Sequence, residues 1–313
     1  MKGLELAEKF YIEYGEPMLK TDFPHLLPKI AVGLAGSGSE CFGYDDGLSS
    51  DHDFEPGFCI FLPSEDEVDR REAFLLERAY AKLPREFMGY ERARLSPVGG
   101  NRRGVIRMSE FFEAKTGSPD GELTLHAWLT LPEEALAEAV NGKVFFDGLG
   151  QVTEIRERLS YLPQDVRLKK LAGELVIMGQ AGQYNYPRCI KRGDTAAAQM
   201  SVAEFVNSAL HVIFLLNGKY MPYYKWTFRA LSELPVMSEL YPELEYLISS
   251  GNGTPDARKK QEIIEKICEN IADKLRADGL SNFVGNEAEG HAYAVNNKID
   301  DGEIRNLHVL AAR

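Results

Sequence analysis

The chain has 313 residues, more than one hydrophobic core usually serves, so two domains are expected. It carries 48 acidic and 36 basic residues, a formal net charge of −12, which excludes a protein that coats nucleic acid through unspecific phosphate contacts. With 44% hydrophobic and 27% charged residues, it is also neither disordered nor fibrous.

The cysteines and the apolar runs help to predict the cellular compartment of the protein. Cys41, Cys59, Cys189 and Cys268 lie far apart without metal-ligand spacing, so they are predicted to be free thiols in a reducing environment. The longest apolar stretch, near residues 212–216, is far shorter than the ~20 residues of a membrane span. These features predict a cytoplasmic protein without a membrane segment.

The first part of the chain alternates helical and extended patterns. Apolar spacing predicts a helix over residues 4–14, ended by Gly15 and Pro17. A short apolar run at 30–35 predicts a buried strand that enters a small-residue turn. Further patterns predict a strand at 51–62, a helix at 65–83 and a strand at 104–108.

The second part is predicted to be helical. Helical periods or propensities cover residues 132–140, 152–162, 166–180, 196–217 and 257–278, and a late element covers 301–310. Turn-forming residues at 117–121 suggest a boundary. We therefore expect an α+β fold, with a mixed sheet and flanking helices in residues 1–120 and a helical-bundle domain in residues 121–313 that completes a cleft.

One segment combines several features of a phosphate and metal site. The predicted strand ends in Gly36, Ser37, Gly38 and Ser39, whose amides and hydroxyls could hold phosphate oxygens. We call residues 36–39 the Gly-Ser turn. In extended chain, Asp51 and Asp53 share a face while His52 points away. Two adjacent carboxylates with substrate phosphates suit Mg²⁺ or Mn²⁺.

Eleven residues separate Ser39 from Asp51. A Gly-Ser pair, a spacer of this length and an Asp-x-Asp pair resemble the signature of the DNA polymerase beta type nucleotidyltransferase superfamily. The resemblance implies a metal-dependent enzyme in which Asp51 and Asp53 are catalytic residues and metal ligands, and in which the Gly-Ser turn binds the nucleotide.

Longer stretches resemble a bacterial family catalogued as domain of unknown function 4037. They are residues 33–40, 43–46, 50–53, 128–129, 142–147 and 222–226. This resemblance covers most of the chain and implies a nucleotidyltransferase-like domain followed by a helical domain. It supplies no substrate.

The superfamily often has a third carboxylate on a later strand, as a metal ligand or a base. Here the strand at 104–108 has none, and Glu110 lies just beyond it. Glu55 continues the alternation of Asp51 and Asp53 but precedes Pro56, while Glu122 and Asp147 are more distant candidates. Glu110 and Glu55 both stay open as the third carboxylate, against surface or capping roles.

A triphosphate also needs cations, and the helical half offers two clusters. Arg188 and Arg192, with Lys191, follow an aromatic-proline segment at 184–187. Lys225, with Arg229 four residues later, lies among Tyr223, Tyr224 and Trp226. Lys225 is the preferred nucleotide-binding cation, and the alternative is that the rings pack in the bundle while the charges reach solvent.

Other polar residues have competing interpretations. Asp45 and Asp46 could support the phosphate turn or could simply form a turn, and their segment does not fit a calcium-binding EF-hand. Glu204, Asn207 and His211 recur along one helix face, which favours a satisfied polar seam over a catalytic base at Glu204. The sequence lacks P-loop, Gly-x-Ser-x-Gly and His-Glu-x-x-His motifs.

The expected function is transfer of a nucleoside monophosphate from a nucleoside triphosphate to an acceptor hydroxyl, with release of pyrophosphate. The acceptor, the donor nucleotide and the oligomeric state stay open, and a cationic small molecule is one candidate acceptor for so acidic a chain. The alternative is a regulatory protein that binds nucleotides without catalysis.

Overall fold

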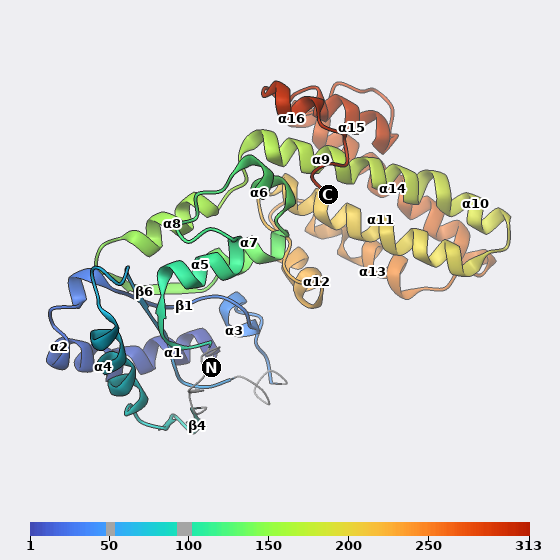
Figure 1. Cartoon of the computed structure of the whole chain (residues 1–313). Coiled ribbons are helices and arrows are strands. Elements are labelled where there is room, and N and C mark those ends of the chain that lie inside the picture. The colour runs from blue at the N-terminus through green and yellow to red at the C-terminus, as the bar shows by residue number, and fades with distance from the viewer. Residues whose placement is uncertain (48–53, 93–101) are drawn as a thin grey trace. The chain divides into compact units, whose positions relative to one another are not determined.

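The computed structural model describes residues 1–47, 54–92 and 102–313. The chain divides into two compact units: unit 1 comprises Met1–Thr124 and Leu131–Ser160, and unit 2 comprises Leu125–Thr130 and Tyr161–Arg313. Unit 1 holds a small mixed sheet with helices and unit 2 is helical (Figure 1), which confirms the α+β class. The division differs from a boundary at residue 120, because 131–160 return to unit 1.

The main sheet of unit 1 has the strand order β5-β2-β1-β6. Strand β1 (Ala31–Leu34) pairs antiparallel with β2 (Cys59–Leu62) and with β6 (Lys143–Asp147), while β2 pairs parallel with β5 (Gly104–Arg107). The predicted strands at 30–35 and 104–108 are confirmed. The strand predicted at 51–62 is shorter: residues 54–58 are irregular, β2 begins at Cys59, and residues 51–53 lie outside the described residues.

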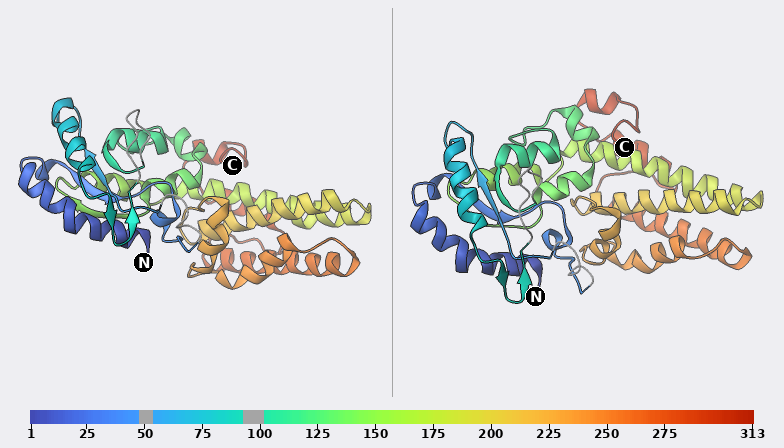
Figure 2. Two further views of the ribbon diagram at one scale, coloured as in Figure 1. Left: turned by 90° about the horizontal axis from the view of Figure 1, so that it is seen from below. Right: turned by 60° about the horizontal axis from the view of Figure 1, so that its bottom comes forward.

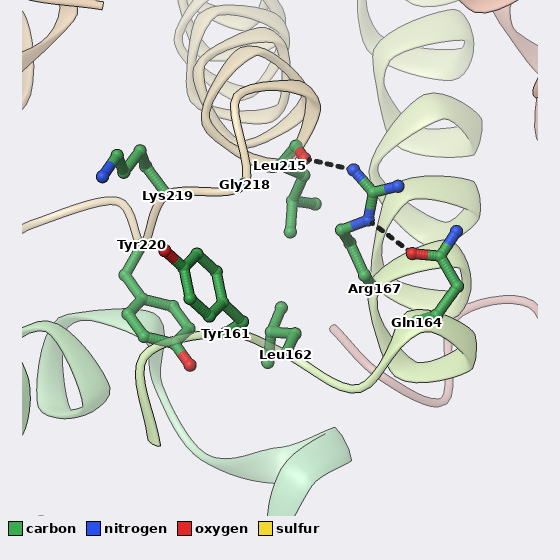
Figure 3. A pocket seen from close by; sticks show the side chains of 8 residues that line it. All are labelled: Tyr161, Leu162, Gln164, Arg167, Leu215, Gly218, Lys219 and Tyr220. Atoms are coloured by element: carbon green, nitrogen blue, oxygen red, sulfur yellow. Dashed lines mark hydrogen bonds between the residues drawn. The ribbon is translucent and has the colours of Figure 1, made fainter. Parts of the chain in front are cut away.

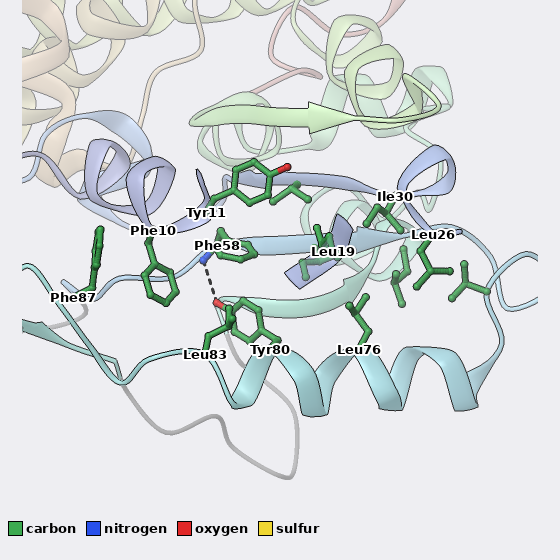
Figure 4. Packing of buried hydrophobic residues seen from close by; sticks show 14 of the residues in the cluster. Phe10, Tyr11, Leu19, Leu26, Ile30, Phe58, Leu76, Tyr80, Leu83 and Phe87 are labelled. Atoms are coloured by element: carbon green, nitrogen blue, oxygen red, sulfur yellow. Dashed lines mark hydrogen bonds between the residues drawn. The ribbon is translucent and has the colours of Figure 1, made fainter. Parts of the chain in front are cut away.

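Helices cover both faces of this sheet. Val32 and Ile60 lie opposite each other in the sheet. They belong to one buried cluster with Phe10 of α1 (Gly3–Phe10) and Tyr80 of α4 (Arg70–Ala81), and Figure 4 shows the latter two. The next residue of β2, Phe61, faces the other way and meets Phe111 of α5 (Met108–Thr116), with ring centroids 5.3 Å apart. The sheet is therefore sandwiched between α1 and α4 on one side and α5 on the other.

Phe58 ties the first layer together. Its backbone N–H donates to the Tyr80 hydroxyl at 3.1 Å, and its ring meets the Tyr80 ring edge-on (Figure 4). The Phe58 side chain is fully buried, which contributes roughly 2 kcal/mol through the hydrophobic effect.

The N-terminal helix runs further than predicted. A π-helical turn, η1 (Tyr11–Gly15), follows α1 and leads directly into α2 (Glu16–Asp22), where Pro17 lies in the first turn. Proline is tolerated there because the first helical amides have no partner within the helix. Gly15 serves close packing rather than termination, since a Cβ at this position would lie 2.3 Å from Cζ of Phe58.

Helix α5 and strand β6 are among the elements of unit 1 that the sequence predictions lack. Strand β6 lies in the half predicted to be helical, between α7 (Glu133–Val140) and α8 (Gln151–Leu159). The remaining elements of this unit are η2 (Leu27–Lys29), α3 (Ser39–Phe42) and the hairpin of β3 (Glu86–Phe87) and β4 (Tyr90–Glu91).

Unit 2 is a helical bundle. Its central helix, α9 (Gln164–Met178), packs against α11 (Thr195–Leu216) and α15 (Ala288–Asn296), and Figure 2 shows α9 and α11 running side by side. A π-helical segment, η4 (Gly179–Asn185), connects α9 to α10 (Tyr186–Lys191). The other elements are α6 (Leu125–Thr130), α12 (Tyr224–Ser232), η5 (Ser238–Leu240), α13 (Tyr241–Ser249), α14 (Thr254–Ala277) and α16 (Gly302–Asn306).

Helix α11 is strongly apolar. Among the described helices, it alone is long and apolar enough to cross a membrane by length and composition, yet 56% of its most apolar window is buried inside the structure. Val202, Phe205, Ala209 and Ile213 are fully buried, and the helix packs against α9, α10 and α13. Packing within the bundle therefore accounts for its apolar character.

Candidate functional site

The Gly-Ser turn leads from β1 into α3. Gly36 and Gly38 have φ angles of +108° and +123°, which residues with a Cβ rarely adopt. At Gly38 a Cβ would also lie 2.0 Å from Nη2 of Arg102. The two glycines therefore allow both the reversal of the chain and the close approach of an arginine.

Asn141 fixes the first residue of this turn. The Gly36 N–H donates to Oδ1 of Asn141, and Nδ2 of Asn141 donates to the Gly36 carbonyl, both at 2.8 Å. Asn141 ends α7 and lies two residues before β6, so the segment between these two elements positions the turn. The Gly36 N–H is therefore bonded to Asn141 in this arrangement, and phosphate binding by the turn stays a prediction.

The hydroxyl of Ser37 joins a charged cluster. It donates to Oε2 of Glu138 at 2.7 Å and accepts from Nζ of Lys115 at 2.8 Å. Lys115 also forms an ion pair with Glu138. Lys115 lies on α5 and Glu138 on α7, so two helices bring a cation and a carboxylate to the exposed serine.

A second cluster lies beneath the turn. Arg102 and Arg103 each donate to Oε1 of Glu40 at 3.1 Å, and Arg103 also pairs with Oε1 of Glu55 at 2.9 Å. Arg102 donates in addition to the Ser37 carbonyl. The side chains of Glu40 and Arg103 are only 6% exposed, so mutual pairing compensates their burial. Glu55, a predicted third carboxylate, is thus ion-paired with Arg103.

A cavity of about 590 Å³ opens beside the Gly-Ser turn. Gly36 and Ser37 line it together with Arg102, Lys115 and Glu110. Glu110, the other predicted third carboxylate, is exposed in the first turn of α5. The lining is completed by Glu77 of α4 and by Ala35, Val105, Ile106, Phe111 and Ala114.

The chemistry of this lining is mixed. It offers a serine hydroxyl, the two cations Arg102 and Lys115, and the two carboxylates Glu77 and Glu110. Cations and hydroxyls bind phosphate oxygens, whereas carboxylates bind divalent cations or accept protons. The cavity thus combines the groups that a metal–phosphate ligand requires.

The predicted metal ligands Asp51 and Asp53, with His52, lie outside the described residues. Within the described ranges, no three His, Cys, Asp or Glu side chains are placed to hold a metal ion. The metal site therefore stays a prediction.

The thiols near the turn are buried. Cys41 donates to the Ser37 carbonyl at 3.8 Å, and Cys59 donates to the Arg102 carbonyl at 3.4 Å. Burial raises the pKa of both thiols, that of Cys59 to about 12. Neither is a nucleophile at neutral pH, because the reactive form of cysteine is the thiolate.

Several acidic candidates have structural partners. Asp45 is buried and accepts from the Gly3 N–H at 2.8 Å, so it anchors the start of α1. Asp147 accepts from the N–H groups of Gly150 and Thr153, at 2.9 and 2.8 Å, and so holds the start of α8. Glu122 lies 3.8 Å from Nη1 of Arg158.

The predicted cations of the helical half are not gathered in one place. Arg188 lies over the ring of Tyr184, 3.8 Å from its centroid, and Lys225 lies 4.9 Å from the ring of Trp226. Helix α10, which carries Arg188 and Lys191 and ends before Arg192, precedes α11, whereas α12, with Lys225 and Arg229, follows it (Figure 1). The 22 residues of α11 span about 33 Å, so one triphosphate cannot reach both clusters.

The polar face of α11 agrees with a polar seam whose side chains have partners, which the sequence favoured over a catalytic base at Glu204. Glu204 forms an ion pair with Arg313, which also approaches Oε1 of Glu174 at 3.5 Å. Asn207 is exposed and His211 is half-buried. Glu204 therefore has a structural partner in Arg313.

Some site residues were not predicted from the sequence. Glu77, Arg102, Lys115, Glu138 and Asn141 all line or hold the site, yet only their contacts across the fold show this. An available signal was the spacing of Glu110 and Lys115, which would place both along one helix had α5 been predicted.

A family model supports the family resemblance over part of the chain. Residues 128–227 match the family described as Domain of unknown function (DUF4037). No curated protein matches the sequence. The crystal structure of a nucleotidyltransferase-like protein from Exiguobacterium sibiricum 255-15 is similar with a TM-score of 0.37 and 12% identity, over 92% of this chain and 81% of that one.

Proposed function

We propose that the chain is a metal-dependent nucleotidyltransferase. It moves a nucleoside monophosphate from a nucleoside triphosphate to an acceptor hydroxyl. The observation that supports this most is the cavity beside the Gly-Ser turn, where Ser37, Arg102, Lys115 and Glu110 meet. Its volume of about 590 Å³ lies within the usual range for small-molecule sites.

The cations and the serine bind the phosphates. Lys115 and Ser37 already contact each other and Glu138, so phosphate oxygens would replace Glu138 as the partner of both. Arg102 supplies a second positive charge to the same cavity. In this proposal the charge of the triphosphate is balanced within unit 1, and Lys225, Arg188 and Arg192 are secondary candidates.

Glu110 is the proposed general base. It is exposed to the cavity and carries no ion pair among the described residues, whereas Glu55 is held by Arg103. Glu110 accepts the proton of the acceptor hydroxyl. At the same time, the oxygen of that hydroxyl bonds to the α-phosphorus. The bond between the α-phosphorus and the bridging oxygen breaks, and pyrophosphate leaves.

Asp51 and Asp53 are the proposed holders of Mg²⁺ or Mn²⁺. The carboxylates that line the described cavity are the hard oxygen donors that these ions prefer, so the chemistry of the site fits such an ion. When bound, the ion supplies positive charge at the phosphates. We further propose a cytoplasmic protein whose acceptor is a cationic small molecule, in keeping with the net charge of −12.

Two assays test this function: the first measures nucleotide binding, and the second measures turnover. We expect ATP or GTP to raise the melting temperature only with Mg²⁺, and pyrophosphate to appear in a screen of acceptor hydroxyls. Asp51→Asn and Asp53→Asn should each abolish turnover while keeping the fold, and Asp66→Asn, at an exposed position, is the matched control.

Retained turnover in either Asp51→Asn or Asp53→Asn would refute the assignment. Nucleotide binding without pyrophosphate for any acceptor class would instead favour a regulatory protein that binds nucleotides. The existing contacts of Lys115 and Ser37 with Glu138 are compatible with that alternative, because they satisfy both groups without a substrate.

A further inference from the structure

A second cavity, of about 250 Å³, lies wholly within unit 2. It is formed where residues 161–162 and the first turns of α9 meet the end of α11 and the turn after it (Figure 3). Its lining residues are Tyr161, Leu162, Gln164, Arg167, Leu215, Gly218, Lys219 and Tyr220. None is acidic, although the chain has 48 acidic residues and 36 basic ones.

Arg167 provides the central charge of this cavity. Its Nη1 donates to the Leu215 carbonyl at 3.1 Å, and its Nε donates to Oε1 of Gln164 at 3.2 Å (Figure 3). Both hydrogen-bond partners are neutral, and the carboxylate that acts on the charge of Arg167 among the described residues, Asp278, forms no ion pair with it. Burial lowers the pKa of the guanidinium, which still stays charged at neutral pH.

Two aromatic rings face the same cavity. Tyr161 and Tyr220 stand side by side opposite Arg167 (Figure 3). Tyr161 is 68% exposed, an unusual state for a large ring that only fills a core. A flat ring could stack there with its apolar surface covered by Leu162.

Lys219 adds a second cation at the rim. Its side chain is exposed and extends away from Arg167 (Figure 3). The flexible stem of a lysine lets its ammonium group turn toward an anion held near Arg167. The cavity, of about 250 Å³, therefore has an aromatic side and a cationic side.

We infer that this cavity binds a small planar anion, an aromatic ring that carries a phosphate or a carboxylate group. The tyrosines stack with the ring, and Arg167 with Lys219 binds the anionic group. This inference is independent of the proposed function, because the cavity shares no residue with the one beside the Gly-Ser turn.

Calorimetric titration of the full chain tests the inference. The probes are phenyl phosphate and benzoate, with benzyl alcohol and benzylamine as neutral and cationic rings and with inorganic phosphate as an anion without a ring. We expect saturable binding of at least one anionic ring and none of the other two rings. Stronger binding of phenyl phosphate assigns the phosphate form, and stronger binding of benzoate assigns the carboxylate form.

Variants locate the binding. Arg167→Gln should weaken the binding of the anionic ring by at least about tenfold. The control Arg71→Gln, which replaces an exposed arginine of α4, should not weaken it. Tyr161→Ala lies at an exposed position and should not disturb folding. It should weaken the binding of the anionic ring about threefold to tenfold and leave the binding of inorganic phosphate unchanged. Lys115→Met should have no effect, which separates this cavity from the proposed nucleotide site.

Circular dichroism shows whether each variant is folded. If Arg167→Gln does not fold, Tyr161→Ala and Lys219→Gln carry the test alone. The inference is overturned if no anionic ring saturates the protein up to about 10 mM, if benzylamine binds as well as benzoate, or if the folded variants bind like the wild type.

Discussion

Cations with defined hydrogen-bond or ion-pair partners occur in both units, but the partners differ. Around the Gly-Ser turn of unit 1, Arg102, Arg103 and Lys115 pair with carboxylates, and Arg102 and Lys115 line a cavity. In unit 2, Lys169 and Lys260 are fully buried and bind neutral oxygens. Burial lowers the pKa of both lysines.

The partners indicate what each cation does. Nζ of Lys169 donates to Oδ1 of Asn296 at 2.8 Å and to the Leu307 carbonyl at 2.6 Å, so it joins α9 to the C-terminal segments. Nζ of Lys260 donates to Oε1 of Gln199 and to the Ser250 carbonyl, at 3.0 and 2.9 Å. These lysines crosslink helices. A buried charge therefore suggests a ligand site only where it also faces open space.

The largest expected effect concerns Lys169. Lys169→Ala removes a fully buried side chain and leaves several oxygens of unit 2 without their donor, so it should lower the free energy of unfolding by about 4 kcal/mol. Urea denaturation measures this, with the exposed Lys298→Ala as control, expected within about 0.5 kcal/mol of the wild type. An equal loss of free energy of unfolding in both variants would show that Lys169 does not stabilise unit 2 through its buried contacts.

Glu40 tests the buried cluster of unit 1. Glu40→Gln leaves the buried Arg103 with one carboxylate partner fewer, so the free energy of unfolding should fall by about 3 kcal/mol. The exposed Glu5→Gln, which loses only a surface pair with Lys9, should leave the free energy of unfolding unchanged within error. A Glu40 variant as stable as the control would show that the cluster does not hold the turn.

Lys115 separates ligand binding from stability. Lys115→Met should weaken nucleotide binding about tenfold, equal to about 1.4 kcal/mol, because a charge-assisted phosphate contact is lost. The change in the free energy of unfolding should stay within about 0.5 kcal/mol, since the pair with Glu138 is partly exposed. Lys143→Met removes a similar ion pair, with Glu8, away from the cavity and should not alter nucleotide binding in calorimetry.

The smallest expected effect is a pH dependence in unit 2. His291 is buried, binds Ser281 and the Gly285 carbonyl, and has its pKa lowered by that burial. The unfolded chain therefore binds the proton more readily than the folded one, so stability is full above pH 6.5 and falls as the pH drops below it. Melting curves should show that His291→Gln loses part of this dependence, whereas the exposed His126→Gln keeps it.

Local patterns predicted the elements whose signal lies in adjacent residues. Strand β1 and its Gly-Ser turn followed from an apolar run that ends in glycines, and α11 followed from its long apolar period. Helix α5 was missed because its adjacent Phe111 and Phe112 blur the helical period. Strand β6 was missed because its pairing with β1 joins residues more than a hundred positions apart.

The site shows the same limit. Gly36, Ser37 and Glu110 were candidates by motif and now line one cavity, whereas Lys115, Glu138 and Asn141 reach the turn across 78 to 105 residues of sequence. Long-range contacts of this kind leave no local pattern. The cations predicted in the helical half were chosen by neighbouring aromatic residues, which indicate packing as readily as a ligand site.

A structure of the protein with Mg²⁺ and a non-hydrolysable triphosphate analogue tests the central claim most directly. We predict phosphate oxygens in contact with the Ser37 hydroxyl and Nζ of Lys115, Lys115 released from Glu138, and a cation between Asp51 and Asp53. A nucleotide bound elsewhere, with its phosphates away from Ser37 and Lys115, would contradict the claim.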